Sequence, residues 1–329
     1  DERRIWIDWE DNKFGKRGFA QMIYYTNIGT IAPNNNYLVF TSDGTMVGQL
    51  SSSFVSSLRN GDVFLLGGST YRVSSIRGTR VNVSPATGYR PTIPSWTGEA
   101  NSRTHELSQE VLELLEEVAT YARLEKDPMT IFTDILGLNR PVAHAVSGFF
   151  QEHVATTFQV PSNDLILVEQ VEAPLPTYIV TTCRGRAFNL ALGHLFAGIA
   201  TNDNIIVHEL SFDENGFMIK LSHEVEISLI PEIFKQGNSK DVLQKHMMES
   251  QLFAKRFREI SSRSMLNPRR IGAEEVSPKQ FQQRAEQIMQ KHRQMDDSVL
   301  IRETMNEILH ADLDMAQLEI FINRMDSED

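Results

Sequence analysis

The first hundred residues show short apolar runs separated by turn residues. Runs rich in Val, Ile, Tyr, Phe and Thr occupy residues 4–9, 19–25, 36–40, 45–50, 62–67, 70–76 and 79–85. Turn-forming residues such as Ser42-Asp43-Gly44 and Gly67-Gly68 separate these runs, whereas only residues 51–61 have a helical pattern. Many short strands joined by tight turns are typical of a small antiparallel β-barrel or sandwich. We therefore predict a β-barrel-like domain over residues 1–100.

The spacing of apolar residues changes to that of helices after residue 104. Residues 107–126 repeat an apolar residue every three or four positions, as on the buried face of a helix. Gly137 ends a second short helical pattern, and Pro141 suits the first turn of a helix that reaches about residue 157. Residues 88–107 lack periodicity and are predicted to be an extended crossing. A helical subdomain is expected over residues 101–160.

The second half of the chain alternates strand and helix patterns before it becomes wholly helical. Strands are predicted at 164–171, 176–183, 204–212 and 217–222, with a helix at 185–200 and an Asn215-Gly216 hairpin turn. This order describes a ββαββ layer over residues 161–235. Helices at 239–264, 277–294 and 297–325 form a C-terminal helical region over 236–329. The predicted fold class is α+β.

Composition fits folded domains, and charge is unevenly distributed along the chain. The 329 residues include 41% apolar side chains, with 32 Lys and Arg against 43 Asp and Glu. Residues 1–100 carry 10 basic and 8 acidic side chains, and residues 240–294 carry 12 and 6, while the other segments are strongly acidic. Because a polyanion responds to the local field, the two basic segments can form a strand-binding face despite the net charge of −11. Solvated helix surfaces without a partner are the alternative.

The chain lacks the motifs of common catalytic sites. It has no G-x-x-x-x-G-K-[ST] loop, no G-x-G-x-x-G after a strand and no H-E-x-x-H. Cys183 is the single cysteine, which excludes an internal disulfide and favours a reducing, cytoplasmic setting. It lies in an apolar strand and is expected to be a buried structural thiol, although Arg184 and Arg186 leave a thiol enzyme as an alternative. No apolar run suits a membrane span, so no membrane partner is expected.

Basic and aromatic residues suited to single-stranded nucleic acid gather in the β-rich segment. Such strands are bound by cations that follow the phosphates and by surfaces that stack on bases. The candidate cations are Arg72, Arg77, Arg80, Arg90, Lys16 and Arg17. Trp96, in an aperiodic stretch between Pro94 and Gly98, is the candidate for stacking, or else it closes the end of the barrel. Trp6 and Trp9 are expected to be packing residues. A second basic cluster surrounds a helix break at residues 255–270.

Several segments, in order along nearly the whole chain, resemble motifs of one helicase family. These are residues 24–31 (YYTNIGTI), 47–50 (VGQL), 61–68 (GDVFLLGG), 94–100 (PSWTGEA), 185–192 (GRAFNLAL) and 256–264. They are similar to the large helicase-related (Lhr-type) branch of the superfamily-two DEAD/DEAH-box helicases, in an archaeal form. One departure is the sequence Ala32-Pro33-Asn34, where the family has a proline followed by acidic residues.

The resemblance implies that this chain is a non-catalytic, C-terminal helicase-associated region. Two RecA-like ATPase domains and a winged helix are then expected ahead of it, with ATP and Mg bound there and no cofactor here. The implied partners are single-stranded DNA or RNA and an RNA–DNA hybrid, unwound with 3′-to-5′ polarity. By motif position, Ile31 and Trp96 would touch the strand. A platform that docks a nucleic-acid repair or processing protein is the alternative function.

Overall fold

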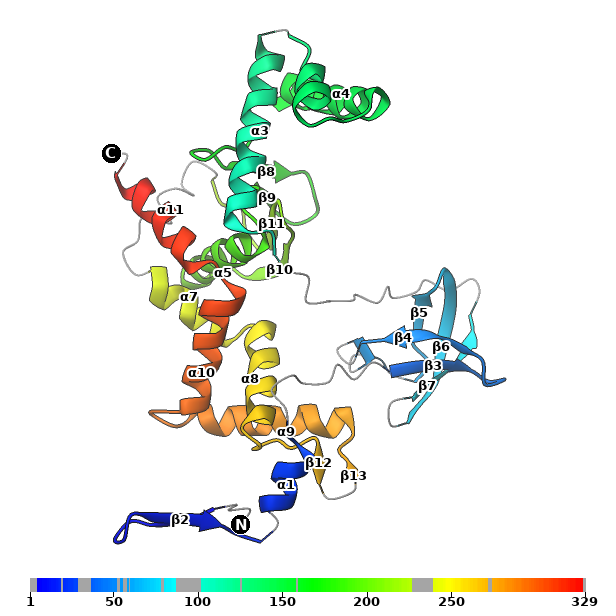
Figure 1. The fold of residues 1–329 in the computed structure, drawn as a ribbon, viewed down its shortest axis with the longest axis vertical. Helices are drawn as coiled ribbons and strands as arrows, with labels where there is room; N and C mark the ends of the chain where they lie inside the picture. Colours follow the sequence, from blue (N-terminus) through cyan, green and yellow to red (C-terminus); the bar gives the residue numbers. More distant parts are fainter. Residues whose placement is uncertain are drawn as a thin grey trace. The chain divides into compact units, whose positions relative to one another are not determined.

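The computed structural model describes two compact units. It covers residues 5–18, 20–28, 37–51, 54–55, 58, 60–77, 80–86, 102–124, 126–157, 159–226, 239–271 and 274–327. Unit 1 comprises residues 1–100 and 251–304, and unit 2 comprises residues 101–250 and 305–329 (Figure 1). The two basic segments of the sequence therefore belong largely to the same unit, although residues 101–239 separate them in the chain.

Unit 1 begins with a β-hairpin and a short helix. Strands β1 (Ile5–Asp8) and β2 (Lys13–Lys16) pair antiparallel, with Trp6 opposite Gly15. A Cβ atom at Gly15 would lie 2.7 Å from the Trp6 indole, so the absent side chain lets the ring lie on the strand. The predicted strand at residues 19–25 is wrong, because helix α1 (Ala20–Thr26) occupies it. A short apolar run fits either structure, and here the Thr26 hydroxyl bonds back to the Met22 carbonyl in the helical i−4 pattern.

A five-stranded sheet follows in unit 1. Its strands are β3 (Tyr37–Thr41), β4 (Met46–Leu50), β5 (Val63–Leu66), β6 (Ser69–Arg77) and β7 (Arg80–Pro85). Their order is β4-β3-β7-β6-β5, and the β3–β7 pair is parallel where the sequence predicted antiparallel strands throughout. The described strands form an open sheet, so a closed barrel is not confirmed. One face carries the core, formed by alternating residues that include Val39, Phe64 and Val81.

The remainder of unit 1 is mainly helical. Helices α8 (Gln251–Arg263) and α9 (Pro278–Arg293) pack together, and α10 (Val299–Glu307) follows. Phe253 and Phe257 are fully buried on α8 with their rings stacked 6.4 Å apart. A minimal hairpin of β12 (Arg270–Ile271) and β13 (Glu274–Glu275) separates α8 from α9, and β12 packs against α1.

Unit 2 starts with a helical pair that matches the predicted helical subdomain in type. Helix α3 (His105–Arg123) begins where the Thr104 hydroxyl accepts a hydrogen bond from the Leu107 N–H group. It packs against α4 (Arg140–Thr157), with the π-helical turn η1 (Ile131–Ile135) between them. Val118, Phe132 and Ala143 form the buried core of this pair.

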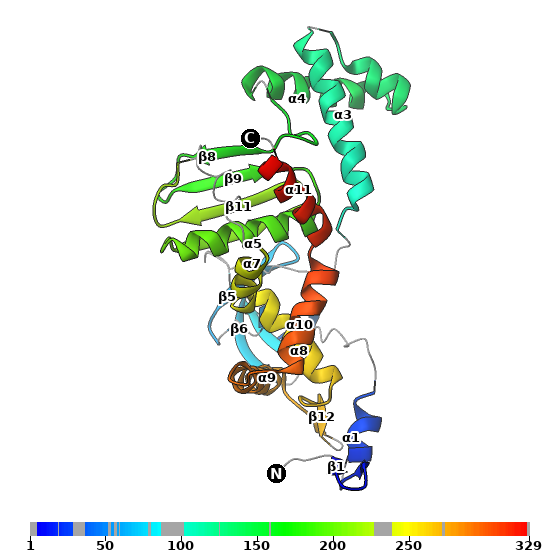
Figure 2. The ribbon, with the colours of Figure 1, turned by 90° about the vertical axis from the view of Figure 1, so that its left-hand side faces the viewer.

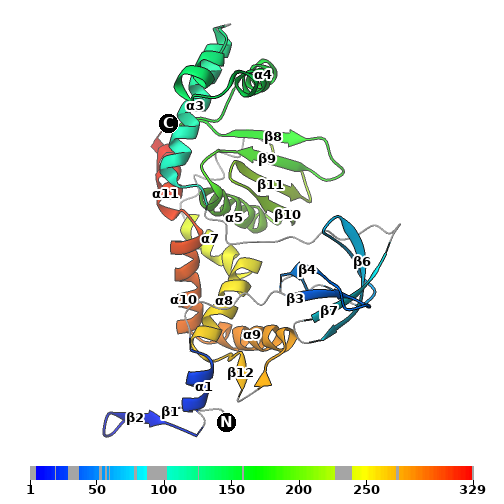
Figure 3. The same ribbon diagram turned by 45° about the vertical axis from the view of Figure 1, so that its right-hand side comes forward.

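The predicted ββαββ layer is confirmed in unit 2. Its strands β8 (Leu167–Val171), β9 (Thr177–Thr181), β10 (Val207–Phe212) and β11 (Gly216–Leu221) are ordered β10-β11-β9-β8. Helix α5 (Arg186–Asn202) lies across one face of this sheet (Figure 2). A Cβ at Gly193 would meet Phe212 at 2.6 Å, so this glycine permits the close approach. Helices α7 (Ser239–Met248) and α11 (Met315–Ser327) pack on α5, and the π-helical segment η3 (Ile308–Asp312) precedes α11 (Figure 3).

Candidate nucleic-acid interface

The solvent-facing side of the five-stranded sheet brings predicted arginines together. In the register of the sheet, Gln49, Leu38, Arg80 and Arg77 form one row across β4, β3, β7 and β6. Residues that lie opposite each other in a sheet project from the same face. Since Val81 and Val83 point to the core, Arg77 and Arg80 both project to the opposite face, and both are exposed.

Contacts with the neighbouring row hold the Arg80 side chain in place. Its guanidinium lies 3.9 Å from the ring centre of Phe40, and its Nε–H donates to Asn82 Oδ1 at 2.9 Å. The Asn82 amide in turn donates to Ser75 Oγ at 3.1 Å. An arginine has five N–H donors in a planar fork. These contacts therefore orient the guanidinium on an aromatic ring and leave donors on its terminal nitrogens for a ligand.

The third described arginine of the sheet has the same orientation. Arg72 lies opposite Ser84 of β7 and Val63 of β5, and its side chain is half-buried. The whole segment 37–86 holds four arginines against two aspartates. A single sheet face thus carries positive charge beside an aromatic ring, which are the two chemical features that recognise single-stranded nucleic acid.

The other predicted contact residues divide into two groups. Lys16 and Arg17 lie at the end of β2, both exposed, and the Lys16 ammonium donates to Gln21 Oε1 at 2.6 Å. They belong to the N-terminal hairpin rather than to the sheet. Ile31, Arg90 and Trp96 lie outside the described residues, so their roles stay predictions.

Aromatic residues of the N-terminal hairpin are exposed, which sequence reasoning missed. Trp9 is 80% exposed and Phe14 is 78% exposed. The prediction that Trp9 is a packing residue is therefore wrong, whereas Trp6 lies partly on Gly15. β1 ends at Asp8, so Trp9 falls in the turn, where no sheet face is available to bury it. The turn-forming run Glu10–Lys13 was the signal available in the sequence.

Basic and acidic side chains are unequally divided between the two units. Unit 1 contains 21 Lys and Arg against 15 Asp and Glu, whereas unit 2 contains 11 against 28. The formal charges are thus +6 and −17. A polyanion is attracted by the first field and repelled by the second. This contrast is stronger than any that the linear sequence displays, because folding adds the basic segment 251–304 to unit 1.

Cys183 is buried, as the sequence predicted. Burial raises the pKa of its thiol, Arg103 partly opposes this shift, and Asp213 adds to it. A raised pKa disfavours the reactive thiolate. The neighbouring charged groups have structural partners instead: the Glu214 carboxylate accepts the Arg186 N–H at the start of α5 (3.0 Å), and Arg103 donates to the Cys183 carbonyl (2.8 Å). The thiol-enzyme alternative has no support from this geometry.

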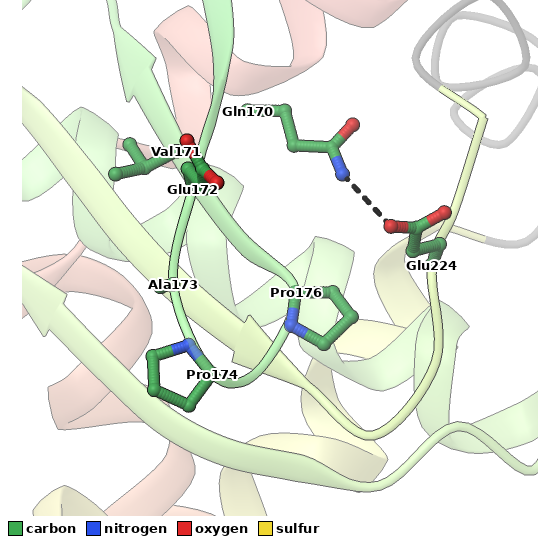
Figure 4. A pocket seen from close by; sticks show the side chains of 7 residues that line it. All are labelled: Gln170, Val171, Glu172, Ala173, Pro174, Pro176 and Glu224. Carbon is green, nitrogen blue, oxygen red and sulfur yellow. Dashed lines mark hydrogen bonds between the residues drawn. The ribbon is translucent and has the colours of Figure 1, made fainter.

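A shallow hollow in unit 2 has no catalytic arrangement either. It has a volume of about 440 Å³ and is lined by the β8–β9 turn together with Glu224. Figure 4 shows Gln170 directed toward Glu224, and the two side chains are joined by a hydrogen bond of 3.3 Å. Its carboxylates would repel a phosphate, and its prolines cannot act as nucleophiles. Within the described part of the chain there is also no group of three metal-ligating side chains, and no helix of sufficient length and apolarity to cross a membrane.

Comparison with sequence families gives two matches. The family described as DEAD/H associated matches residues 160–329. The family described as "Large helicase-related protein, winged helix domain" matches residues 1–93. The second match assigns the winged-helix description to a segment inside this chain, whereas the sequence-based expectation had put that domain ahead of it.

Individual relatives carry related descriptions. The "ATP-dependent helicase Lhr-Core protein 2" of Thermococcus barophilus is 30% identical over 97% of this chain and 37% of its own length. The "ATP-dependent helicase Lhr-Core" of Methanothermobacter thermautotrophicus is 30% identical over 95% and 37%. The "Lhr helicase/uracil glycosylase" of Escherichia coli is 26% identical over 93% and 20%. This chain thus spans little more than a third of the archaeal relatives.

A solved structure shares the fold. The helicase Lhr of Mycobacterium smegmatis, bound to single-stranded DNA and AMP-PNP, superposes with a TM-score of 0.68 at 18% identity. The match covers 98% of this chain and 38% of that protein. A likeness over nearly the whole chain supports the α+β fold.

Proposed function

Since this chain belongs to the DEAD/H-associated family of the large helicase-related (Lhr) proteins, we propose that it is the nucleic-acid-contacting region of an ATP-dependent helicase. In this proposal it hydrolyses nothing itself. It guides the single strand along which ATPase domains of the same polypeptide move, using ATP and Mg, with 3′-to-5′ polarity. Single-stranded DNA is the first expected ligand, because the Mycobacterium smegmatis relative is bound to it, and RNA or an RNA–DNA hybrid is the next.

The observation that carries this proposal is the arginine face of the five-stranded sheet. Arg77 and Arg80 occupy one row of the sheet, and Phe40 supports the Arg80 guanidinium at 3.9 Å. Guanidinium groups bind phosphate through two parallel N–H donors, so a pre-oriented arginine loses less conformational freedom on binding than a mobile one. We expect Arg77 and Arg80 to contact successive phosphates while Arg72 adds charge nearby.

Two predicted residues complete the mechanism. Trp96 would stack on a base and act as a fixed step against which the ATPase domains pull the strand, while Ile31 would pack on a sugar or base. Arg90, Lys16 and Arg17 would add phosphate contacts. These assignments come from motif position and residue chemistry, and base stacking is worth about 1–3 kcal/mol per base.

Salt titration of strand binding tests the proposal. A fluorescently labelled oligothymidine is bound to the 329-residue chain, and affinity is measured by anisotropy over a range of salt concentrations. Each lost phosphate contact lowers the slope of log affinity against log salt by about 0.7 for a single strand, so the double variant Arg77→Ala/Arg80→Ala should flatten it by about 1.4. Arg302→Ala is the control, because Arg302 pairs with Asp297 at 2.7 Å on another part of unit 1. An unchanged slope in the double variant would refute the phosphate role.

A protein-docking function is the second candidate, and the charge of unit 2 favours it. Unit 2 combines its −17 charge with exposed apolar side chains, among them Ile135 of η1 (67% exposed) and Phe149 of α4 (65% exposed). A basic repair or processing protein would suit that surface. Binding through it should be lost in Phe149→Ala while strand binding is kept.

A further inference from the structure

The side chain of Asn27 joins two segments that lie 243 residues apart. Its Oδ1 accepts the backbone N–H groups of Arg269 at 2.8 Å and Arg270 at 3.0 Å, and its Nδ2 donates to the Arg270 carbonyl at 3.0 Å. The same Nδ2 also donates to the Ile23 carbonyl at 2.9 Å, which fixes the amide at the end of α1. One carboxamide therefore satisfies three backbone groups of a distant loop.

Residues 267–270 also contact helices α8 and α9. Asn267 is fully buried, where its N–H donates to the Ser261 carbonyl and its Nδ2 donates to the Phe281 carbonyl, both at 2.9 Å. The Arg269 guanidinium lies 5.1 Å from the centre of the Phe281 ring. Residues 267–270 are thus fixed between α1, α8 and α9. The Arg270 side chain is exposed at the start of β12.

A predicted strand contact, Ile31, follows shortly after Asn27 in the sequence. Ile31 is four residues after Asn27, and four extended residues span at most about 14 Å. Any strand that touches Ile31 therefore passes close to the loop that Asn27 holds. Resting on the proposed function, we infer that Arg270 is an additional phosphate-binding residue for that strand and that Asn27 is its positioning residue.

The test uses the labelled oligothymidine and the 329-residue chain. Arg270→Ala should weaken binding about tenfold at low salt and flatten the salt slope by about 0.7. Arg270→Lys should restore the slope but only part of the affinity, because an ammonium contacts phosphate as a single point. Arg302→Ala again serves as the matched control.

A double-mutant cycle separates positioning by Asn27 from general stability. Asn27→Ala should weaken binding in the wild-type background and have no further effect in the Arg270→Ala background. Asn27→Asp keeps the two hydrogen bonds that Oδ1 accepts but loses those that Nδ2 donates, so its affinity should lie between those of wild type and Asn27→Ala. Additive effects in the cycle, or an unchanged affinity in Arg270→Ala, would overturn the inference. If Arg270→Ala leaves the salt slope unchanged but Arg77→Ala/Arg80→Ala flattens it, the inference about Arg270 fails and the proposed function stands. If neither variant changes the slope, the inference and the proposed function both fail.

Discussion

Acidification should destabilise unit 2 through one histidine. His194 lies on α5, with its ring 5.2 Å from Phe212 and 5.4 Å from His246 between centroids. Its Nδ1 atom is buried and has no hydrogen-bond partner among the described residues. Burial lowers the pKa of His194 from 6.5 to about 4, and the neighbouring His246 adds to this shift. Folding therefore favours the neutral ring.

The pH dependence of the free energy of unfolding follows from the difference in proton binding at His194 between the folded and unfolded chains. Between pH 6.5 and pH 4 the unfolded chain binds a proton at His194 that the folded chain does not, so the free energy of unfolding falls as the pH falls through this window. A difference of 2.5 units, at 1.36 kcal/mol per unit, gives a loss of about 3 kcal/mol by pH 4. Burial also lowers the pKa of His246, which adds a loss in the same direction.

The assay can separate this effect from unit 1. All three tryptophans, Trp6, Trp9 and Trp96, lie in unit 1, so tryptophan fluorescence contains no signal from unit 2. Far-ultraviolet circular dichroism reports both units. In urea titrations from pH 7 to pH 4, the loss should appear in the dichroism transition and be absent from the fluorescence transition if the units unfold separately.

Two variants complete the design. His194→Leu removes the titrating group and the unpartnered nitrogen, so it should keep its stability at pH 7 and lose about 3 kcal/mol less than wild type on acidification. His144→Leu, at an exposed position of α4, should follow the wild-type curve. Equal pH dependence in wild type and His194→Leu would refute the assignment.

Three further predictions concern the described core and the proposed strand contact. Gly185→Ala should lower the free energy of unfolding by about 2 kcal/mol or more, because Gly185 has φ +91° and a Cβ there would lie 2.8 Å from the Arg103 carbonyl oxygen; Gly148→Ala, in open space on α4, should stabilise instead. Cys183 should react with a thiol reagent in urea but scarcely in buffer, and Cys183→Ser should leave strand binding unchanged; rapid labelling of the folded chain would contradict its burial. In a polypeptide that carries the ATPase domains, Trp96→Ala should impair unwinding and spare strand-dependent ATP hydrolysis, whereas equal loss of both would mark Trp96 as structural.

Local signals predicted the ββαββ layer well. The Asn215-Gly216 pair marks the β10–β11 hairpin, where Asp213 Oδ1 accepts the N–H groups of both residues. The apolar residues of α5 are numerous and continue over more than four helical turns, which predicted a buried helix there. The sequence also places Arg77 and Arg80 on either side of a two-residue turn, which makes them cross-strand partners.

Non-local and ambiguous features could not be predicted in this way. The seven-residue helix α1 carries an apolar run that fits a strand equally well, and tertiary contacts decide between them. The parallel β3–β7 pair depends on how the chain crosses the sheet rather than on any local pattern. The hydrogen bonds between Asn27 and Arg270 could not be predicted either, because neither segment carries a sequence pattern that indicates contact with the other.

We propose that the basic unit, and not the acidic one, contacts the strand. Photo-crosslinking tests it most directly: an oligonucleotide with photoreactive bases is bound to the intact chain, irradiated, and the modified peptides are identified by mass spectrometry. We predict adducts within residues 1–100 and 251–304, concentrated on β3, β6 and β7. Adducts confined to residues 101–250 and 305–329 would contradict the account.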